Sequence, residues 1–179
     1  MTAPTDVLLL PGRFYGTSAP LMMYAGDVAE RRGLTVHRHE WQGEPPDPRE
    51  PAIVGWVEAQ VGPRVEAIGG APVLIGKSLG SQAAGLAAAR SLPAIWLTPL
   101  LTVSWVADAL ARSPAPFLLI GGTADQVWDA DAAHRLTPHV LSVPEADHGM
   151  YVPGPLTESI AVLSRVVVAI DEFLSTLSA

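Results

Sequence analysis

The sequence predicts an α/β fold, a three-layer α/β/α sandwich whose mostly or fully parallel six-stranded sheet lies between helices. Two observations predict it. Short strands alternate with helical patterns along the chain, an order typical of parallel sheets that are covered on both faces. Several of these strands are unbroken apolar runs, as expected where central strands are buried on both faces. In such sheets ligands bind at the carboxyl ends of the strands, so we expect the chemistry in the loops that follow them.

The N-terminal part predicts two strands around one helix. The apolar run 7–10 is the first strand, and Pro11-Gly12 closes it. Residues 19–32 have a helical pattern that ends at Gly33, a residue that commonly stops a helix. Residues 34–41 alternate between apolar and polar side chains, which predicts an edge strand.

The middle of the chain continues the alternation. A polar, proline-rich loop over 42–51 precedes apolar residues at helical spacing over 52–68. Pro63 lies inside this helix, where the missing N–H predicts a kink or a break. The apolar run 72–75 is the next strand, and 81–90 is a helix.

The last part repeats the pattern to the C-terminus. Strands are predicted over 94–97, 116–120 and 140–143, and helices over 103–111, 130–135 and 157–177. The 179 residues fit a single domain, residues 1–179, because a chain of this length buries enough surface to fold without disulfide or metal staples.

Composition and charge exclude several classes of protein. With 49% hydrophobic and 16% charged residues, the chain is not generally disordered. The net charge of −7 argues against nucleic acid or an anionic membrane as the main partner. The absence of cysteine excludes disulfides, a thiolate nucleophile and a cysteine-based zinc site.

No targeting or membrane segment is predicted. The N-terminus has no basic start, and the apolar stretch 7–10 is too short for a signal-peptide core. The longest apolar-rich segment, 160–170, contains Ser164 and Arg165 and is too short to span a bilayer. We therefore expect a soluble cytoplasmic protein.

The motif G-x-S-x-G indicates a nucleophile at Ser78. Gly76-Lys77-Ser78-Leu79-Gly80 directly follows the strand 72–75 and precedes the helix 81–90. A serine on such a strand-to-helix turn is held in a strained backbone conformation with its hydroxyl exposed. The flanking glycines suit the turn because side chains there would collide with neighbouring segments. The alternative interpretation is that Ser78 is only a small residue in a tight turn.

Two later loops carry the partners that a serine nucleophile needs. Asp125 follows the strand 116–120, and His148 follows the strand 140–143. An imidazole takes the serine proton during attack, and a carboxylate orients the imidazole and stabilises its charged form. The order along the chain is Ser78, Asp125, His148, which is the order of the α/β-hydrolase triad.

Other residues compete for these roles. Asp125 could instead cap a helix or form a turn, which would leave Asp129 or Asp131 as the acid. Asp147 is adjacent to His148 in sequence, but a turn-forming role is expected because loop neighbours rarely point their side chains at each other. The remaining histidines are interpreted as surface residues, or as a His-x-His pair on the edge strand that lacks further metal ligands: His134, His139, His37 and His39. No metal site is predicted.

On these motifs the chain resembles a small, lidless α/β-hydrolase of the serine hydrolase and esterase type, over essentially its full length. The resemblance implies a nucleophile at Ser78, an acid at Asp125 and a base at His148. The chain differs from the full-length family in lacking the first two, antiparallel strands. It also has no room for a cap domain between the strands 94–97 and 116–120.

The resemblance also implies an oxyanion hole. One donor is the backbone N–H of Leu79, the residue after the nucleophile. The second lies in the loop after the first strand, where Gly12 matches the turn residue of the family and Pro11 replaces its usual histidine. The N–H of Arg13 or of Phe14 is the second donor, and the sequence leaves both open.

A substrate pocket is expected around these groups. Its predicted residues are Gly12, Tyr15, Lys77, Met150 and Tyr151, and its walls are expected from the loop 42–51 and the segment 100–113. Lys77 could be a solvated charge or could raise the positive potential near an anionic substrate. Trp105 and Trp128 are expected on the same side of the molecule.

The predicted function is hydrolysis of a small-molecule ester or thioester with a small to medium acyl group, through an acyl-enzyme and without a cofactor. The alternative is an α/β-hydrolase-fold binding module with an unused triad, or a non-hydrolytic biosynthetic enzyme. The shallow, lidless site expected from the missing cap motivates this alternative. The oligomeric state is left open.

Overall fold

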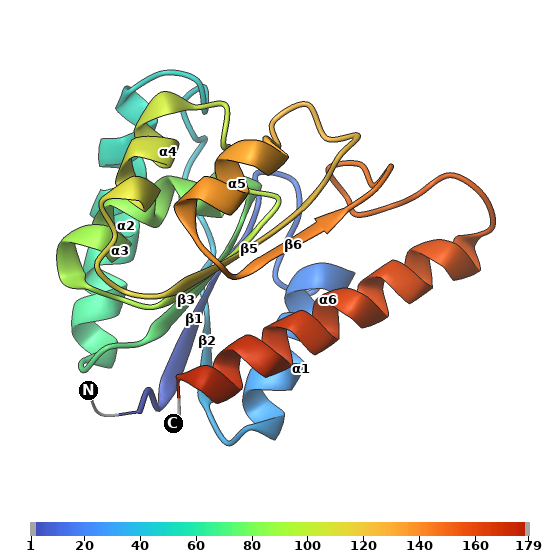
Figure 1. Ribbon diagram of the computed structural model, residues 1–179. Coiled ribbons are helices and arrows are strands. Elements are labelled where there is room, and N and C mark those ends of the chain that lie inside the picture. Colours follow the sequence, from blue (N-terminus) through green and yellow to red (C-terminus); the bar gives the residue numbers. More distant parts are fainter. Residues whose placement is uncertain (1–2, 178–179) are drawn as a thin grey trace.

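The computed structural model describes residues 3–177 and has the predicted sheet (Figure 1). All six strands are parallel and lie in the order β2-β1-β3-β4-β5-β6. The strands are β1 (Asp6–Leu10), β2 (Thr35–Arg38), β3 (Val73–Lys77), β4 (Ala94–Leu97), β5 (Phe117–Gly122) and β6 (Val140–Val143). The predicted fold class is therefore confirmed.

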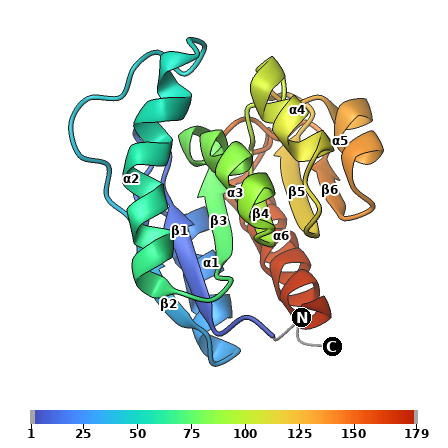
Figure 2. The ribbon, with the colours of Figure 1, turned by 90° about the vertical axis from the view of Figure 1, so that its left-hand side faces the viewer.

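Helices cover both faces of the sheet, as Figures 1 and 2 show. On one face lie α1 (Pro20–Arg31) and α6 (Leu156–Thr176). On the other lie α2 (Ala52–Ile68), α3 (Ala84–Arg90), α4 (Ser104–Ala111) and α5 (Ala130–Leu136).

Two apolar cores follow from this layering. Successive side chains of a strand point to opposite faces, so Val7 and Leu9 of β1 pack in the core under α1 and α6. Leu8 and Leu10 pack in the core under α2, α3 and α4. All four side chains are fully buried, which explains why the central strands are unbroken apolar runs.

Three elements differ from their predicted form. β2 ends at Arg38, so His39 lies beyond the strand rather than on it. α2 runs without a break through Pro63, because Val61 and Val65 on either side are buried against the sheet and hold the helix together despite the lost hydrogen bond. The segment after Ser78 begins as a 3-10 turn, η1 (Ser78–Ala83), before α3 starts.

The order of the strands creates the place for a site. From β1 the chain moves outward to β2 and then returns to β3 on the opposite side of β1. The loops that follow β1 and β3 therefore leave the sheet in opposite directions, which opens a crevice at the carboxyl ends of these strands. The loops after β5 and β6 reach the same edge of the sheet.

Candidate active site

Ser78 stands where β3 turns sharply into η1. Its backbone has φ +50°, a left-handed conformation that non-glycine residues rarely adopt. The neighbouring glycines make the turn possible, because a Cβ on Gly76 would lie 2.6 Å from the Trp96 ring and one on Gly80 would lie 2.3 Å from the Leu10 carbonyl oxygen. The turn thus needs glycine on both sides of the serine.

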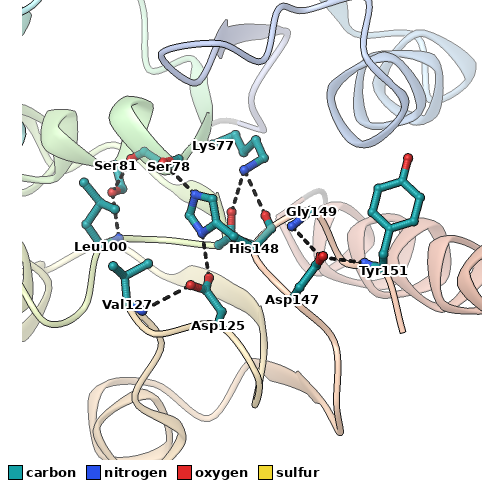
Figure 3. A network of polar contacts seen from close by, with 11 residues as sticks. Lys77, Ser78, Ser81, Leu100, Asp125, Val127, Asp147, His148, Gly149 and Tyr151 are labelled. Carbon is teal, nitrogen blue, oxygen red and sulfur yellow. Dashed lines mark hydrogen bonds and ion pairs between the residues drawn. The ribbon is translucent and has the colours of Figure 1, made fainter. Parts of the chain in front are cut away.

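A chain of hydrogen bonds links Ser78 to residues from two other loops (Figure 3). The Oγ of Ser78 lies 2.9 Å from Nε2 of His148, and Nδ1 of His148 lies 2.7 Å from Oδ2 of Asp125. Both distances are within hydrogen-bond range. The structure therefore brings together the three side chains that the sequence singled out.

Asp125 is held in place by its own loop. Its Oδ1 accepts a hydrogen bond from the Val127 N–H at 3.1 Å, which leaves Oδ2 for His148. The loops after β5 and β6 are joined by a bond from the Ala124 N–H to the Ala146 carbonyl at 3.0 Å. The Asp125 side chain is 3% exposed and the His148 side chain 42%, so a buried carboxylate supports an accessible imidazole.

The other aspartates have different roles. Asp129 is the N-cap of α5 and accepts a hydrogen bond from the Ala132 N–H at 2.8 Å. Asp131 is exposed in the first turn of the same helix. Asp147 accepts hydrogen bonds from the N–H groups of Gly149 and Tyr151 at 2.8 and 2.9 Å, which confirms its turn-forming role (Figure 3).

Lys77 is buried, so its interpretation as a solvated charge is wrong. Its Nζ donates to Thr98 Oγ1 at 2.9 Å and to the His148 carbonyl oxygen at 3.1 Å. The same atom lies 4.9 Å from the centre of the Tyr15 ring, in cation–π range. Burial lowers the pKa of Lys77 to about 8, although the carboxylates of Asp125 and Asp147 act in the opposite direction.

An open hollow of about 270 Å³, here called the Ser78 hollow, lies in front of the serine. It is lined by the segment 12–15, by Lys77 and Ser78, and by His148 and Gly149. Within the described residues, the backbone N–H groups of Leu79, Arg13 and Phe14 have no protein acceptor. The three candidate oxyanion donors therefore have no competing acceptor in this part of the chain, and two of them, Arg13 and Phe14, belong to residues that line the hollow.

Met150 and Tyr151 border a second space instead of the Ser78 hollow. This apolar groove, of about 200 Å³, is lined by Tyr15, Pro20, Leu21, the segment 149–151 and four residues of α6 between Leu156 and Leu163. The two spaces share Tyr15 and Gly149.

The expected walls of the pocket are wrong. Neither 42–51 nor 100–113 lines the Ser78 hollow, and Arg49 and the segment 102–105 instead border a separate hollow. Trp105 donates through Nε1 to Gln82, while the Trp128 ring packs over Gly121. Both indoles support the framework rather than the hollow, because Trp105, in the first turn of α4, binds η1 and Trp128 packs against β5.

Sequence reasoning missed two buried hydroxyl groups beside the serine. Ser81 Oγ donates to the Ser78 carbonyl at 2.6 Å and accepts from the Leu100 N–H at 3.1 Å, which joins the turn to the loop after β4 (Figure 3). Thr98, with φ +43°, holds Lys77. The available signal was position alone, since Thr98 directly follows β4 and Ser81 lies in η1, shortly after β3.

The histidines of the expected edge strand do not form a pair. His37 Nε2 lies 2.7 Å from Asp6 Oδ1, and His39 is buried with its ring edge against Trp41. Burial lowers the pKa of His39 to about 4, so the ring is neutral near pH 7. Within residues 3–177, no cluster of three or more His, Asp or Glu side chains could hold a metal ion.

Comparison with solved structures identifies the fold. The chain is similar to Est1E from Butyrivibrio proteoclasticus, with a TM-score of 0.73 and 13% identity over 98% of this chain and 88% of that one. It is similar to XC6422 from Xanthomonas campestris, an α/β serine hydrolase without a lid, with a TM-score of 0.61 and 18% identity over 97% and 84%. It is also similar to the monoacylglycerol lipase of Paleococcus ferrophilus, with a TM-score of 0.64 and 16% identity over 94% and 97%.

These likenesses establish the α/β-hydrolase fold in a form without a cap, as the sequence motifs predicted. No protein-family model matches the chain, and no curated protein matches it in sequence. In the part of the chain from residue 3 to residue 177, no helix has the length and apolar content needed to cross a membrane.

Proposed function

We propose that the protein is a serine hydrolase that cleaves a small-molecule ester or thioester through an acyl-enzyme. One observation carries the proposal: the hydrogen bonds from Ser78 to His148 and from His148 to Asp125 form one uninterrupted chain of 2.9 and 2.7 Å. This arrangement activates a hydroxyl that is otherwise a weak nucleophile. The fold of the structural neighbours also supports a hydrolase.

In the first half-reaction, Ser78 Oγ attacks the carbonyl carbon of the substrate while His148 Nε2 takes the hydroxyl proton. Asp125 stabilises the imidazolium that forms, because its carboxylate bonds to the opposite ring nitrogen. The carbonyl oxygen becomes an oxyanion and accepts hydrogen bonds from the free N–H of Leu79 and from that of Arg13 or Phe14. The intermediate then collapses, the C–O or C–S bond breaks, and His148 returns the proton to the leaving alcohol or thiol.

In the second half-reaction, water takes the place of the leaving group. His148 removes a proton from this water, which attacks the acyl carbon, and Ser78 leaves with the proton that His148 returns. The 42% exposure of the His148 side chain gives water a direct path to the base. Only side chains and backbone N–H groups of this chain take part, so the proposed reaction requires no cofactor.

Labelling with a fluorophosphonate, followed by intact-mass measurement, tests the proposal. The probe forms a stable adduct with an activated serine, so we expect one adduct on the native protein and none on Ser78→Ala. Ser164→Ala is the matched control, because Ser164 is exposed on α6 and lines neither the Ser78 hollow nor the apolar groove. Absence of an adduct on folded native protein would contradict the proposal and favour a binding module. A panel of esters and thioesters then identifies the bond that is cleaved.

A further inference from the structure

The apolar groove has few groups that could bind a polar ligand. Among residues 3–177, no charged side chain lines it, and two of the three side-chain hydroxyls that line it have protein partners. Ser159 Oγ accepts from the Val152 N–H at 3.1 Å and donates to the Val152 carbonyl at 3.4 Å, while Tyr15 Oη accepts from the Leu21 N–H at 2.9 Å. A charged ligand would lose hydration there without gaining partners, whereas an apolar one would not.

The groove adjoins the Ser78 hollow. Tyr15 and Gly149 border both spaces, and Gly149 directly follows His148. A chain that leaves Ser78 and passes between Tyr15 and Gly149 would enter the groove. On its outer side the groove is bordered by the exposed apolar side chains Tyr151, Leu156 and Ile160. Apolar side chains gathered at a concave surface are typical of a binding site.

We propose that the apolar groove holds the acyl chain of the substrate, which makes the substrate an ester or thioester of a medium-chain apolar acid. This assignment rests on the proposed hydrolase function. The acyl chain is the occupant because it stays bonded to Ser78 through both half-reactions, whereas the leaving group must escape to solvent. The groove volume of about 200 Å³ holds about six or seven groups the size of a water molecule, at ~30 Å³ each. With the carboxyl carbon and its neighbour placed in the Ser78 hollow beside the serine, the matching acids have about eight carbons.

Binding to an inactive variant tests the groove without any need for turnover. The probes are methyl ketones with chains of increasing length, titrated into Ser78→Ala and followed by protein NMR. We expect Kd to fall about threefold per added methylene, because each one leaves water for an apolar wall, and to level off near eight carbons. The signals of Leu163 and Met150 should shift on binding.

Two matched variants of α6 identify the surface responsible. Ile160 and Val168 lie on the same helix and are 56% and 51% exposed, but only Ile160 lines the groove. In the Ser78→Ala background, Ile160→Glu should abolish the dependence of Kd on chain length, and Val168→Glu should retain it. A Kd that is independent of chain length, or a dependence that survives Ile160→Glu, would overturn the proposal.

Hydrolysis by the native enzyme separates the acyl chain from the alcohol chain. We expect kcat/KM to rise about threefold per methylene along p-nitrophenyl esters of longer acids, and to stay flat along acetate esters of longer alcohols. A rise only along the alcohol series would overturn the acyl assignment. If no ester is cleaved but ketone binding depends on chain length and on Ile160, the hydrolase proposal fails while the groove remains an apolar-chain site.

Discussion

The Nζ of Lys77 donates to the backbone carbonyl oxygen of His148 at 3.1 Å (Figure 3). Lys77 immediately precedes Ser78, and His148 is the residue whose ring contacts the Ser78 hydroxyl. The two residues are 71 positions apart, and this bond ties the end of β3 to the loop after β6. Thr98 Oγ1, from the loop after β4, is the second acceptor. One buried amine thus connects the end of β3 to two loops around the site, and we infer that Lys77 is a positioning residue for His148.

Replacing Lys77 with methionine should impair His148 without removing it. Methionine fills most of the same space but cannot donate to the His148 carbonyl, so we expect kcat to fall about tenfold while KM changes less. The rate of fluorophosphonate labelling should fall in parallel. A labelling rate within twofold of native would show that the loop holds His148 without the lysine.

The activity of the native enzyme should also decline as the pH rises through about 8. Nζ loses its proton in this range, and a neutral amine is a weaker donor to the His148 carbonyl. Asp125 and Asp147 favour the charged amine, and the nearby Tyr15 has a raised pKa, so it stays neutral as Lys77 titrates. The measurement is kcat/KM from pH 6 to 10 for native enzyme and Lys77→Met. The same alkaline decline in both proteins would refute the assignment to Lys77.

The free energy of unfolding should also depend on pH through the Lys77 amine, and it should rise as the pH increases. Because the pKa is about 8 in the folded state against 10.5 for an ordinary lysine, the unfolded chain binds more protons between these values. The free energy of unfolding therefore rises with pH from about 8 to about 10.5, and the penalty of burying the charge is fully present below pH 8. Relative to Lys77→Met, the native protein should gain at most about 3 kcal/mol across this range, measured by urea denaturation. A constant difference between the two proteins would contradict the lowered pKa.

The sheet and the three polar residues of the site were predictable because their signals are local. Unbroken apolar runs mark the central strands, and Ser78 and Asp125 each follow such a run within a few residues. His148 follows the edge strand β6 at a similar distance. In a parallel sheet the carboxyl ends of the strands meet at one edge, so three local signals combine into one site without knowledge of any contact.

The environment of Lys77 and the position of the pocket were not predictable in this way. The partners of Lys77 are a hydroxyl 21 residues away and a backbone carbonyl 71 residues away, and neither carries a charge that a pattern would reveal. The apolar groove depends on how α1 and α6 approach the loop after His148. The 42–51 loop does not line the Ser78 hollow, because Gln82 donates to the Pro48 carbonyl and holds this loop over η1.

Asp125→Asn should abolish most of the activity while retaining the fold. The amide keeps the size of the carboxylate but cannot stabilise the imidazolium, and it favours the wrong tautomer of His148, so we expect the rate to fall on the order of 10³–10⁴-fold. Asp129→Asn is the control, because Asn and Asp are equally good N-caps and Asp129 caps α5. A loss of less than tenfold in Asp125→Asn would mean that another group orients His148.

A methyl group on Gly80 should disrupt the turn that presents Ser78. The new Cβ would lie 2.3 Å from the Leu10 carbonyl oxygen, a backbone atom that cannot move aside, so we expect a loss of at least about 3 kcal/mol in unfolding free energy. Gly85→Ala is the matched control, since the nearest atom to its Cβ is a Glu58 carboxylate oxygen at 3.6 Å. In the first turn of α3 that alanine should stabilise by up to about 1 kcal/mol. Thermal denaturation measures the stability of Gly80→Ala and Gly85→Ala, and equal melting temperatures for the two variants would exclude the steric explanation.

Ser81→Ala should show how much the backbone turn at Ser78 depends on the Ser81 hydroxyl. The variant leaves the buried Leu100 N–H without an acceptor and removes the 2.6 Å bond to the Ser78 carbonyl. An unsatisfied buried donor costs about 1–3 kcal/mol, so urea denaturation should report a loss in this range, and Ser164→Ala should report none. The labelling rate of Ser78 should fall as well, because φ +50° is maintained only while the surrounding contacts enforce it. If stability falls but labelling is unchanged, then Gly76 and Gly80 alone maintain the conformation of Ser78, and Ser81 serves only the packing of η1 against the loop after β4.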